Sequence, residues 1–72
     1  MYVALRYSDN QLGRTMMCDT WADAVSACVM LAKENNEPLT QDQIDHLAGE
    51  GEVNNKVGQA NYHIGQLEQF SS

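Results

Sequence analysis

The stretch DTWADAVSACVMLAKENNEPLTQDQIDHLAG, residues 19–49, decides the fold because it encodes two helices separated by a proline. Thr20 is a suitable N-cap, and apolar residues follow it at the three- and four-residue spacing of one buried face. These apolar residues are Trp21, Ala24, Val25, Cys28, Leu31 and Ala32. Pro38 ends the helix, since the residue before a proline disfavours helical backbone. We therefore predict a central helix over residues 20–34, around which the core is built.

A second helix begins directly after the proline. Thr40 is its predicted N-cap and Gln43 its capping-box partner, while Leu39 and Ile44 occupy the two positions of a hydrophobic staple. Gly49 is the expected C-terminal stop. The expected inner stripe of this helix is Ile44, Leu47 and Ala48.

Strands are expected before this helical region. Tyr2, Val3, Leu5 and Tyr7 in residues 2–7 are aromatic or apolar, and period-two alternation places the last three on one face. Residues 8–11 have turn chemistry, which Gly13 supports, and residues 14–18 form a second short strand.

The last third has two interpretations. Val53, Val57, Ala60, Ile64 and Leu67 follow helix-like intervals, whereas Ala60, Tyr62 and Ile64 alternate as in a strand. Glycines and asparagines count against a helix, and Tyr62 with Ile64 favours a strand. We predict a strand over residues 59–67 that pairs beside the first strand, with His63 on its outer face. Residues 49–55 are expected to be a loop.

The predicted fold is therefore α+β, with element order ββααβ: a small three-stranded antiparallel sheet with two helices on one face. A chain of 72 residues forms one domain at most. We expect that domain to comprise residues 1–68, followed by a frayed tail at residues 69–72.

The charge of the chain limits its partners. Ten acidic residues against four basic ones give a formal charge of −6. Such a chain repels phosphate backbones and attracts basic surfaces. Six carboxylates lie between residues 34 and 52 with no basic residue among them: Glu34, Glu37, Asp42, Asp45, Glu50 and Glu52. They predict a surface for a basic partner, while the simpler alternative is that they only keep the protein soluble.

A helix-turn-helix DNA-binding regulator is an alternative use of residues 40–67. Asn54, Asn55, Gln59 and Asn61 could contact base edges from a second helix over residues 52–67. Phosphate contacts need several positive charges, however, and Lys56 would be the only one. We therefore expect no direct binding of nucleic acid.

Catalytic and metal-binding motifs are not found. Cys18 and Cys28 are expected to be free buried thiols, and Asp42 with His46 could share a cation only as an isolated pair. We expect no enzyme activity, no metal and no cofactor. The first residues resemble no signal peptide and no apolar run spans a membrane, so a cytoplasmic location is expected.

The sequence thus predicts a non-enzymatic interaction protein that occludes a basic, nucleic-acid-handling partner. Asp42, Asp45, Glu50 and Glu52 would supply charge, with Glu34 and Glu37 as outer members, and tyrosines on the sheet (Tyr2, Tyr7, Tyr62) as anchors. The chain is similar in size and charge alone to small acidic phage inhibitors, including anti-CRISPR proteins and other DNA mimics. A third alternative is an accessory or homodimeric subunit that associates through a sheet edge.

Overall fold

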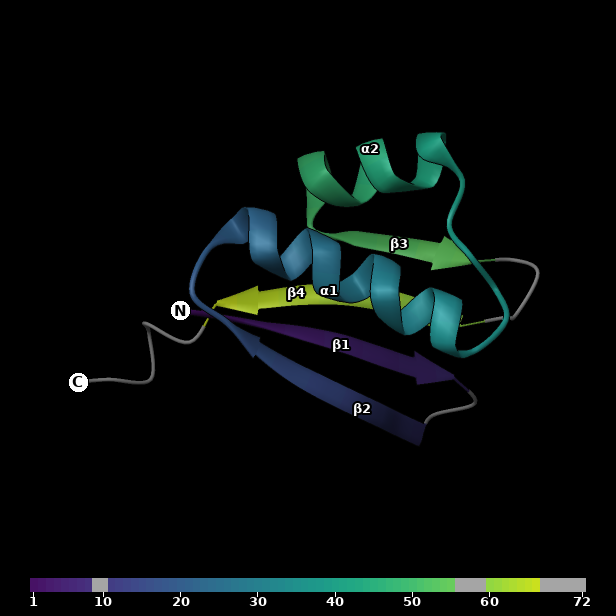
Figure 1. Ribbon diagram of the computed structural model, residues 1–72, viewed down its shortest axis with the longest axis horizontal. Coiled ribbons are helices and arrows are strands. Elements are labelled where there is room, and N and C mark those ends of the chain that lie inside the picture. Colours follow the sequence, from purple (N-terminus) through teal and green to yellow (C-terminus); the bar gives the residue numbers. More distant parts are fainter. Residues whose placement is uncertain (9–10, 56–59, 67–72) are drawn as a thin grey trace.

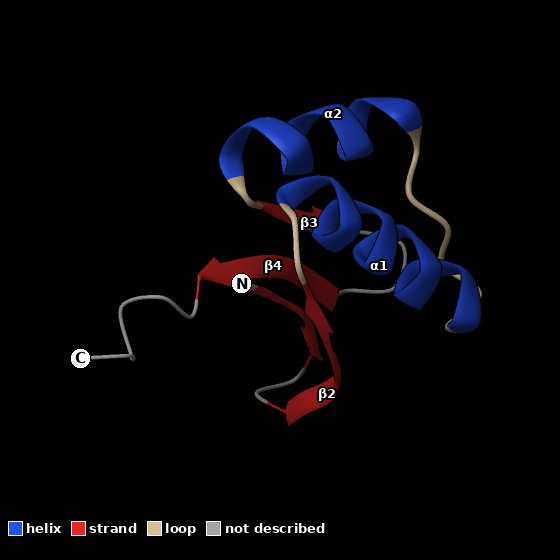
Figure 2. Cartoon of the chain, turned by 60° about the vertical axis from the view of Figure 1, so that its left-hand side comes forward, coloured by secondary structure: helices blue, strands red, loops and turns tan. Residues whose placement is uncertain are grey.

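The computed structural model describes residues 1–8, 11–55 and 60–66, which form two helices and a four-stranded antiparallel sheet (Figure 1). The elements in chain order are β1 (Tyr2–Ser8), β2 (Gln11–Cys18), α1 (Trp21–Glu34), α2 (Gln41–Glu50), β3 (Glu52–Asn55) and β4 (Ala60–Gln66). The strand order across the sheet is β2-β1-β4-β3. Both helices lie on one face of the sheet, and no helix of the described residues lies on the other (Figure 2). The predicted α+β class is confirmed.

The prediction of three strands is wrong, because residues 52–55 form the additional strand β3. β3 pairs with β4 from Glu52 opposite His63 to Asn55 opposite Ala60. The amide of Ile64 also donates to the carbonyl of Gly51 at 2.7 Å, just before β3 begins. Two asparagines in four residues gave no local strand signal, so the pairing with β4 decides this conformation.

The last third of the described chain is strand and not helix. β4 pairs along β1 with Ala4 opposite Ile64, which confirms the predicted neighbour of the first strand. Two strands therefore occupy the segment in which the DNA-binding alternative required a helix over residues 52–67, and that helix is a wrong prediction. The predicted tail, residues 69–72, and the predicted end of the domain at residue 68 lie outside the described residues.

The helix starts are formed as the sequence predicts. The Thr20 side chain accepts a hydrogen bond from the amide of Asp23 at 3.1 Å. Thr40 and Gln43 form the full capping box, in which the Thr40 amide donates to the Gln43 side chain at 2.9 Å. These bonds satisfy amide groups that the first turn of a helix leaves without a partner.

The core lies between the helices and the sheet. Its buried members from the helical layer include Cys28, Leu31 and Leu47, and from the sheet Ala4, Tyr62 and Ile64. On α2 the predicted inner stripe is confirmed for Leu47 and in part for Ile44, whereas Ala48 is exposed. On β1 it is Ala4 that faces the helices, so the alternating residues Val3, Leu5 and Tyr7 are on the opposite face of the sheet.

A bulge in β2 brings Arg6 of β1 close to a glycine. Leu5 pairs with Thr15 and Tyr7 with Leu12, so two residues of β2 stand opposite Arg6. A Cβ atom at Gly13, one of these two, would lie 2.9 Å from the Arg6 carbonyl oxygen. Glycine is required at this close backbone approach. Among the described residues, no helix is both long and apolar enough to cross a membrane.

The residue that ends α2 is Gly51 and not the predicted Gly49. Alanine substitutions at the two glycines are therefore expected to change the free energy of unfolding in opposite directions. Gly51 has φ +81° and a Cβ there would lie 3.1 Å from the Trp21 ring, whereas nothing lies within 4 Å of a Cβ at Gly49. We expect Gly51→Ala to lower the free energy of unfolding by about 1–2 kcal/mol, the cost of left-handed backbone for an L-residue.

Gly49→Ala is the matched control. We expect it to raise the free energy of unfolding by up to about 1 kcal/mol, because alanine is preferred over glycine within a helix. Urea denaturation of both variants measures the difference. Equal destabilisation by the two substitutions would contradict the assignment of Gly51 as the helix stop.

Candidate functional site

Helix α2 presents two carboxylates and a histidine to solvent. Asp42 and Asp45 are three residues apart and both project from the side away from buried Leu47, while exposed His46 lies between that side and β3. The side chain of Asp45 accepts a hydrogen bond from Gln41 at 3.0 Å. Neither Asp42 nor Asp45 has an ion-pair partner among the residues described. The predicted pair therefore does lie on one outward face.

The two predicted members that follow are also exposed. Glu50 is the last residue of α2 and forms no ion pair within the described chain. Glu52 begins β3 and points away from the core, since Val53 and Asn55 of the same strand are buried. Its carboxylate lies 3.6 Å from Nδ1 of His63. His63 itself is on the outer face, as predicted.

The other two predicted members are each paired with an arginine of the same chain, Glu34 at the surface and Glu37 in the interior. Glu34 at the end of α1 accepts a hydrogen bond from exposed Arg14 of β2 at 2.7 Å. Glu37 is only 5% exposed, and its Oε1 accepts from Nε of Arg6 at 2.8 Å. Glu37 is therefore structural, and we leave it out of the proposed surface.

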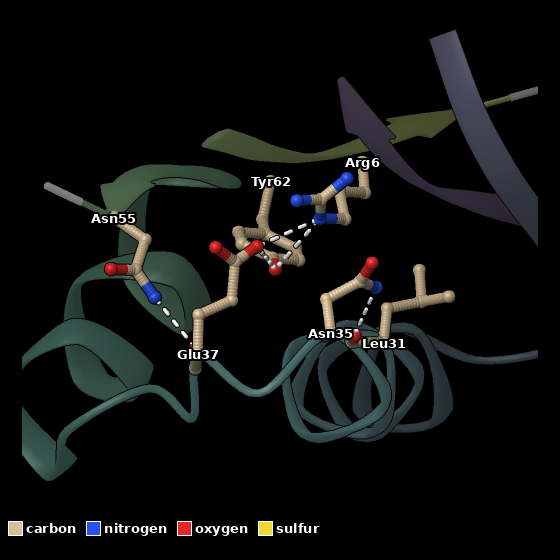
Figure 3. A network of polar contacts seen from close by, with 6 residues as sticks. All are labelled: Arg6, Leu31, Asn35, Glu37, Asn55 and Tyr62. Atoms are coloured by element: carbon tan, nitrogen blue, oxygen red, sulfur yellow. Dashed lines mark hydrogen bonds and ion pairs between the residues drawn. The ribbon is translucent and has the colours of Figure 1, made fainter. Parts of the chain in front are cut away.

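The contacts of Glu37 form a compact polar network under the α1–α2 connection (Figure 3). The Tyr62 hydroxyl donates to Glu37 Oε1 at 2.5 Å, and Arg6 Nε also lies 3.2 Å from that hydroxyl oxygen. Asn55 of β3 donates to the Glu37 backbone carbonyl at 2.7 Å. Residues of β1, β3 and β4 thereby hold the connection that leads into α2.

The network shifts the ionisation of its members. Burial by itself would raise the pKa of Glu37, but the hydrogen bonds from Tyr62 and Arg6 and the charge of Arg6 outweigh it and lower that pKa. Burial raises the pKa of Tyr62 to about 12, and the adjacent Glu37 carboxylate acts in the same direction. Glu37 is thus held as a carboxylate and Tyr62 as a phenol at neutral pH.

The aromatic residues are divided between the two faces of the sheet. Tyr62 is fully buried, and Tyr2 packs edge-on against Trp21 with ring centroids 5.5 Å apart. Trp21 donates from Nε1 to the carbonyl of Ala48 at 2.9 Å, so it joins α1 to the end of α2. Of the predicted tyrosine anchors, Tyr7 is the exposed one.

The two cysteines are buried in the core, apart from a shallow pocket whose lining contains neither of them. Cys18 and Cys28 are both free and buried, and burial raises the pKa of Cys28 to about 11. A shallow pocket of about 280 Å³ lies along β3, and its lining includes His46 and Glu52 but no serine or cysteine. Within the described residues, no group of three or more potential metal ligands gathers.

Sequence reasoning missed two features that matter for function. One is Arg6, whose position on the inner face follows from pairing with Tyr62 and not from local pattern. The other is the uncovered sheet face, because alternation in β1 does not say which side the helices cover.

Comparison with protein-family models, curated proteins and solved structures finds no significant match, so function is inferred from the chain's own residues.

Proposed function

We propose that this protein is a non-enzymatic interaction module that occludes a basic, nucleic-acid-handling surface of another protein. The surface that makes this contact, the acidic α2 surface, consists of Asp42, Asp45, Glu50 and Glu52. Glu34 extends it only at the far end of α1, where Arg14 already neutralises it. The size and charge of the chain suit an inhibitor of the phage anti-defence class, by analogy with small acidic nucleic-acid mimics.

One observation supports this proposal most directly: both arginines form ion pairs with carboxylates of the same chain that lie outside the acidic α2 surface. Arg6 is paired with Glu37 and Arg14 with Glu34, so neither neutralises the acidic α2 surface. The other two basic residues are Lys33 and Lys56. Lys33 forms no ion pair with a described residue. Most of the charge of −6 is consequently left on outward carboxylates.

The arrangement of these carboxylates also suits recognition of an extended basic surface. Asp42 and Glu50 are eight residues apart along α2, which is about 12 Å at 1.5 Å per helical residue. Glu52 continues the series at the start of β3. Helix α2 is capped at both ends and packs on β3 through Leu47, so the charges are held on a rigid support. Rigid, exposed charges favour fast, salt-dependent association.

The experiment is a pull-down from the source cell's lysate with tagged protein at low and moderate salt, analysed by mass spectrometry. We expect one basic, nucleic-acid-handling protein that is lost as salt rises. We expect Asp42→Asn with Asp45→Asn to reduce its recovery at least about tenfold, since charge pairs at interfaces contribute more than 1.4 kcal/mol each in favourable cases.

The matched control is Asp19→Asn with Asp23→Asn. It changes the net charge by the same amount, from −6 to −4. Each double variant also removes one aspartate from the first turn of a helix, Asp23 from α1 in the control and Asp42 from α2 in the test. We expect recovery close to that of the unaltered protein. Equal losses in the two double variants would contradict a local acidic surface. Direct binding of the protein to DNA at low salt would contradict the proposal as a whole, and recovery of no basic partner would leave the carboxylates a solvating role.

A further inference from the structure

Strand β1 directs its larger apolar side chains away from the helices. Ala4 and Arg6 face the helical layer, while Val3, Leu5 and Tyr7 face the opposite side and do not pack on the core. In a one-sided antiparallel sheet the solvent face normally carries polar residues. In β1, an inner strand of the sheet, apolar side chains instead lie on the face that no described helix covers (Figure 2).

The neighbouring strands extend this apolar stripe into an uneven surface. Met17 of β2 stands beside Val3 on one side and is 62% exposed, while Gly65 of β4 stands beside Val3 on the other. A Cβ atom on Gly65 would touch Val3 Cγ1 at 3.3 Å, so the glycine leaves a notch next to that side chain. We call Val3, Leu5, Tyr7, Met17 and Gly65 the open sheet face. Met17 protrudes from this face on one side of Val3, and the notch at Gly65 lies on the other side, in the same row across the strands.

The open sheet face, as defined by these five residues, carries no charged side chain. Across the four strands the only carboxylate is Glu52, which lies on the edge strand β3 beside His63. The other described carboxylates belong to the helices, to the α1–α2 connection or, for Asp19, to the turn between β2 and α1. Two copies can therefore bring their open sheet faces together while Asp42, Asp45 and Glu50 stay on the outside and Glu52 lies at the rim on the edge strand, where solvent and salt screen them.

We propose that the open sheet face is covered by a second copy of this chain in a two-fold symmetric dimer. Neighbouring strands are about 4.8 Å apart, so Met17 and Gly65 lie at equal distances on either side of Val3. A two-fold axis running along β1 exchanges these two positions. It places Met17 of each copy over the Gly65 notch of the other, which is the self-complementarity that an isologous interface requires.

The size of the face predicts a weak dimer. The four strands contain 26 residues, which at a rise of about 3.3 Å and a strand spacing of about 4.8 Å give a footprint of roughly 410 Å² per copy. Side-chain relief adds to this, so complete coverage buries about 1,000 Å² in total, the lower limit for specific interfaces. We expect a dissociation constant in the micromolar range and hence a mass that depends on concentration.

Sedimentation equilibrium over a concentration series tests the proposal. We expect the mass to rise from the 8.0 kDa of one chain towards twice that value. Met17→Glu should raise the dissociation constant at least about tenfold, because it buries an unpaired charge. Met30→Glu is the matched control: Met30 is 50% exposed but lies on α1, and we expect no change.

A second variant separates face-to-face packing from pairing of β2 edges. Gly65→Val fills the notch on β4, which is an inner strand, and it requires Val3 to shift by a few tenths of an ångström, since the new Cβ lies 3.3 Å from Val3 Cγ1. We expect it to weaken the dimer as Met17→Glu does, with circular dichroism unchanged. The proposal is overturned if the unaltered chain stays at 8.0 kDa at every attainable concentration. It is also overturned if Met30→Glu dissociates the dimer as well as Met17→Glu, or if Gly65→Val has no effect.

Discussion

Glu37→Ala is expected to lower the free energy of unfolding by about 3 kcal/mol at pH 7, because it leaves Arg6 and Tyr62 of the buried network without their shared acceptor. The loss is large for a small domain, whose total stability is about 5–15 kcal/mol. Urea denaturation followed by circular dichroism measures it. Part of the loss comes from the α1–α2 connection, which keeps the bond from Asn55 to its backbone carbonyl but loses its side-chain contacts with β1 and β4.

Glu34→Ala is the matched control, since it removes the same side chain from the other Arg–Glu pair. The Glu34–Arg14 pair is exposed on both sides, and such pairs contribute about 0–1 kcal/mol. We expect a loss of no more than about 0.5 kcal/mol. If the two alanine variants lost equal stability, the buried network would be no stronger than a surface ion pair and our account of Glu37 would be wrong.

The same network makes stability depend on pH. The lowered pKa of Glu37 means that the unfolded chain takes up a proton more readily than the folded one as the pH falls. The stabilisation from Glu37 is therefore complete above its ordinary pKa of 4.5 and is lost as the pH falls through and below that value. We expect the stability difference between the unaltered protein and Glu37→Ala to shrink over this acidic range, and a constant difference would contradict the pKa shift.

Leu31→Ala is expected to have a comparable effect through packing and not through charge. Leu31 is 1% exposed in the last turn of α1, within the core formed with Ala4, Leu47 and Tyr62. Truncation of a buried leucine removes apolar contacts and leaves a cavity, which together cost about 2–5 kcal/mol. We expect about 3 kcal/mol in the same urea assay.

Met30→Ala is the control for Leu31→Ala, because the two residues are adjacent in one helix. Met30 is half exposed on the outer side of α1, and we expect its truncation to change the free energy of unfolding by less than about 0.5 kcal/mol. Should Leu31→Ala retain full stability or Met30→Ala lose as much, the inward face of α1 would be assigned wrongly. Leu31→Val, at about 1 kcal/mol, serves if the alanine variant does not fold.

The sequence by itself determined the helices, their start positions and the class of fold. The caps at Thr20 and Thr40 are local bonds between residues three apart, and the apolar spacing of α1 reports its own buried face. Such signals lie within a single helix and its cap, so they can be read without knowledge of the tertiary structure. The outward position of Asp42 and Asp45 follows in the same way, since Ile44 and Leu47 orient α2.

Only the tertiary structure decided which carboxylates are free, where the chain forms its fourth strand and which face of β1 is covered. Glu37 is buried because Arg6 and Tyr62, which are distant in sequence, converge on it from paired strands. Strand β3 exists because β4 supplies its hydrogen bonds. Alternation along β1 defines two faces but not which one the helices cover, because that choice depends on the packing of α1 and α2 over the whole sheet.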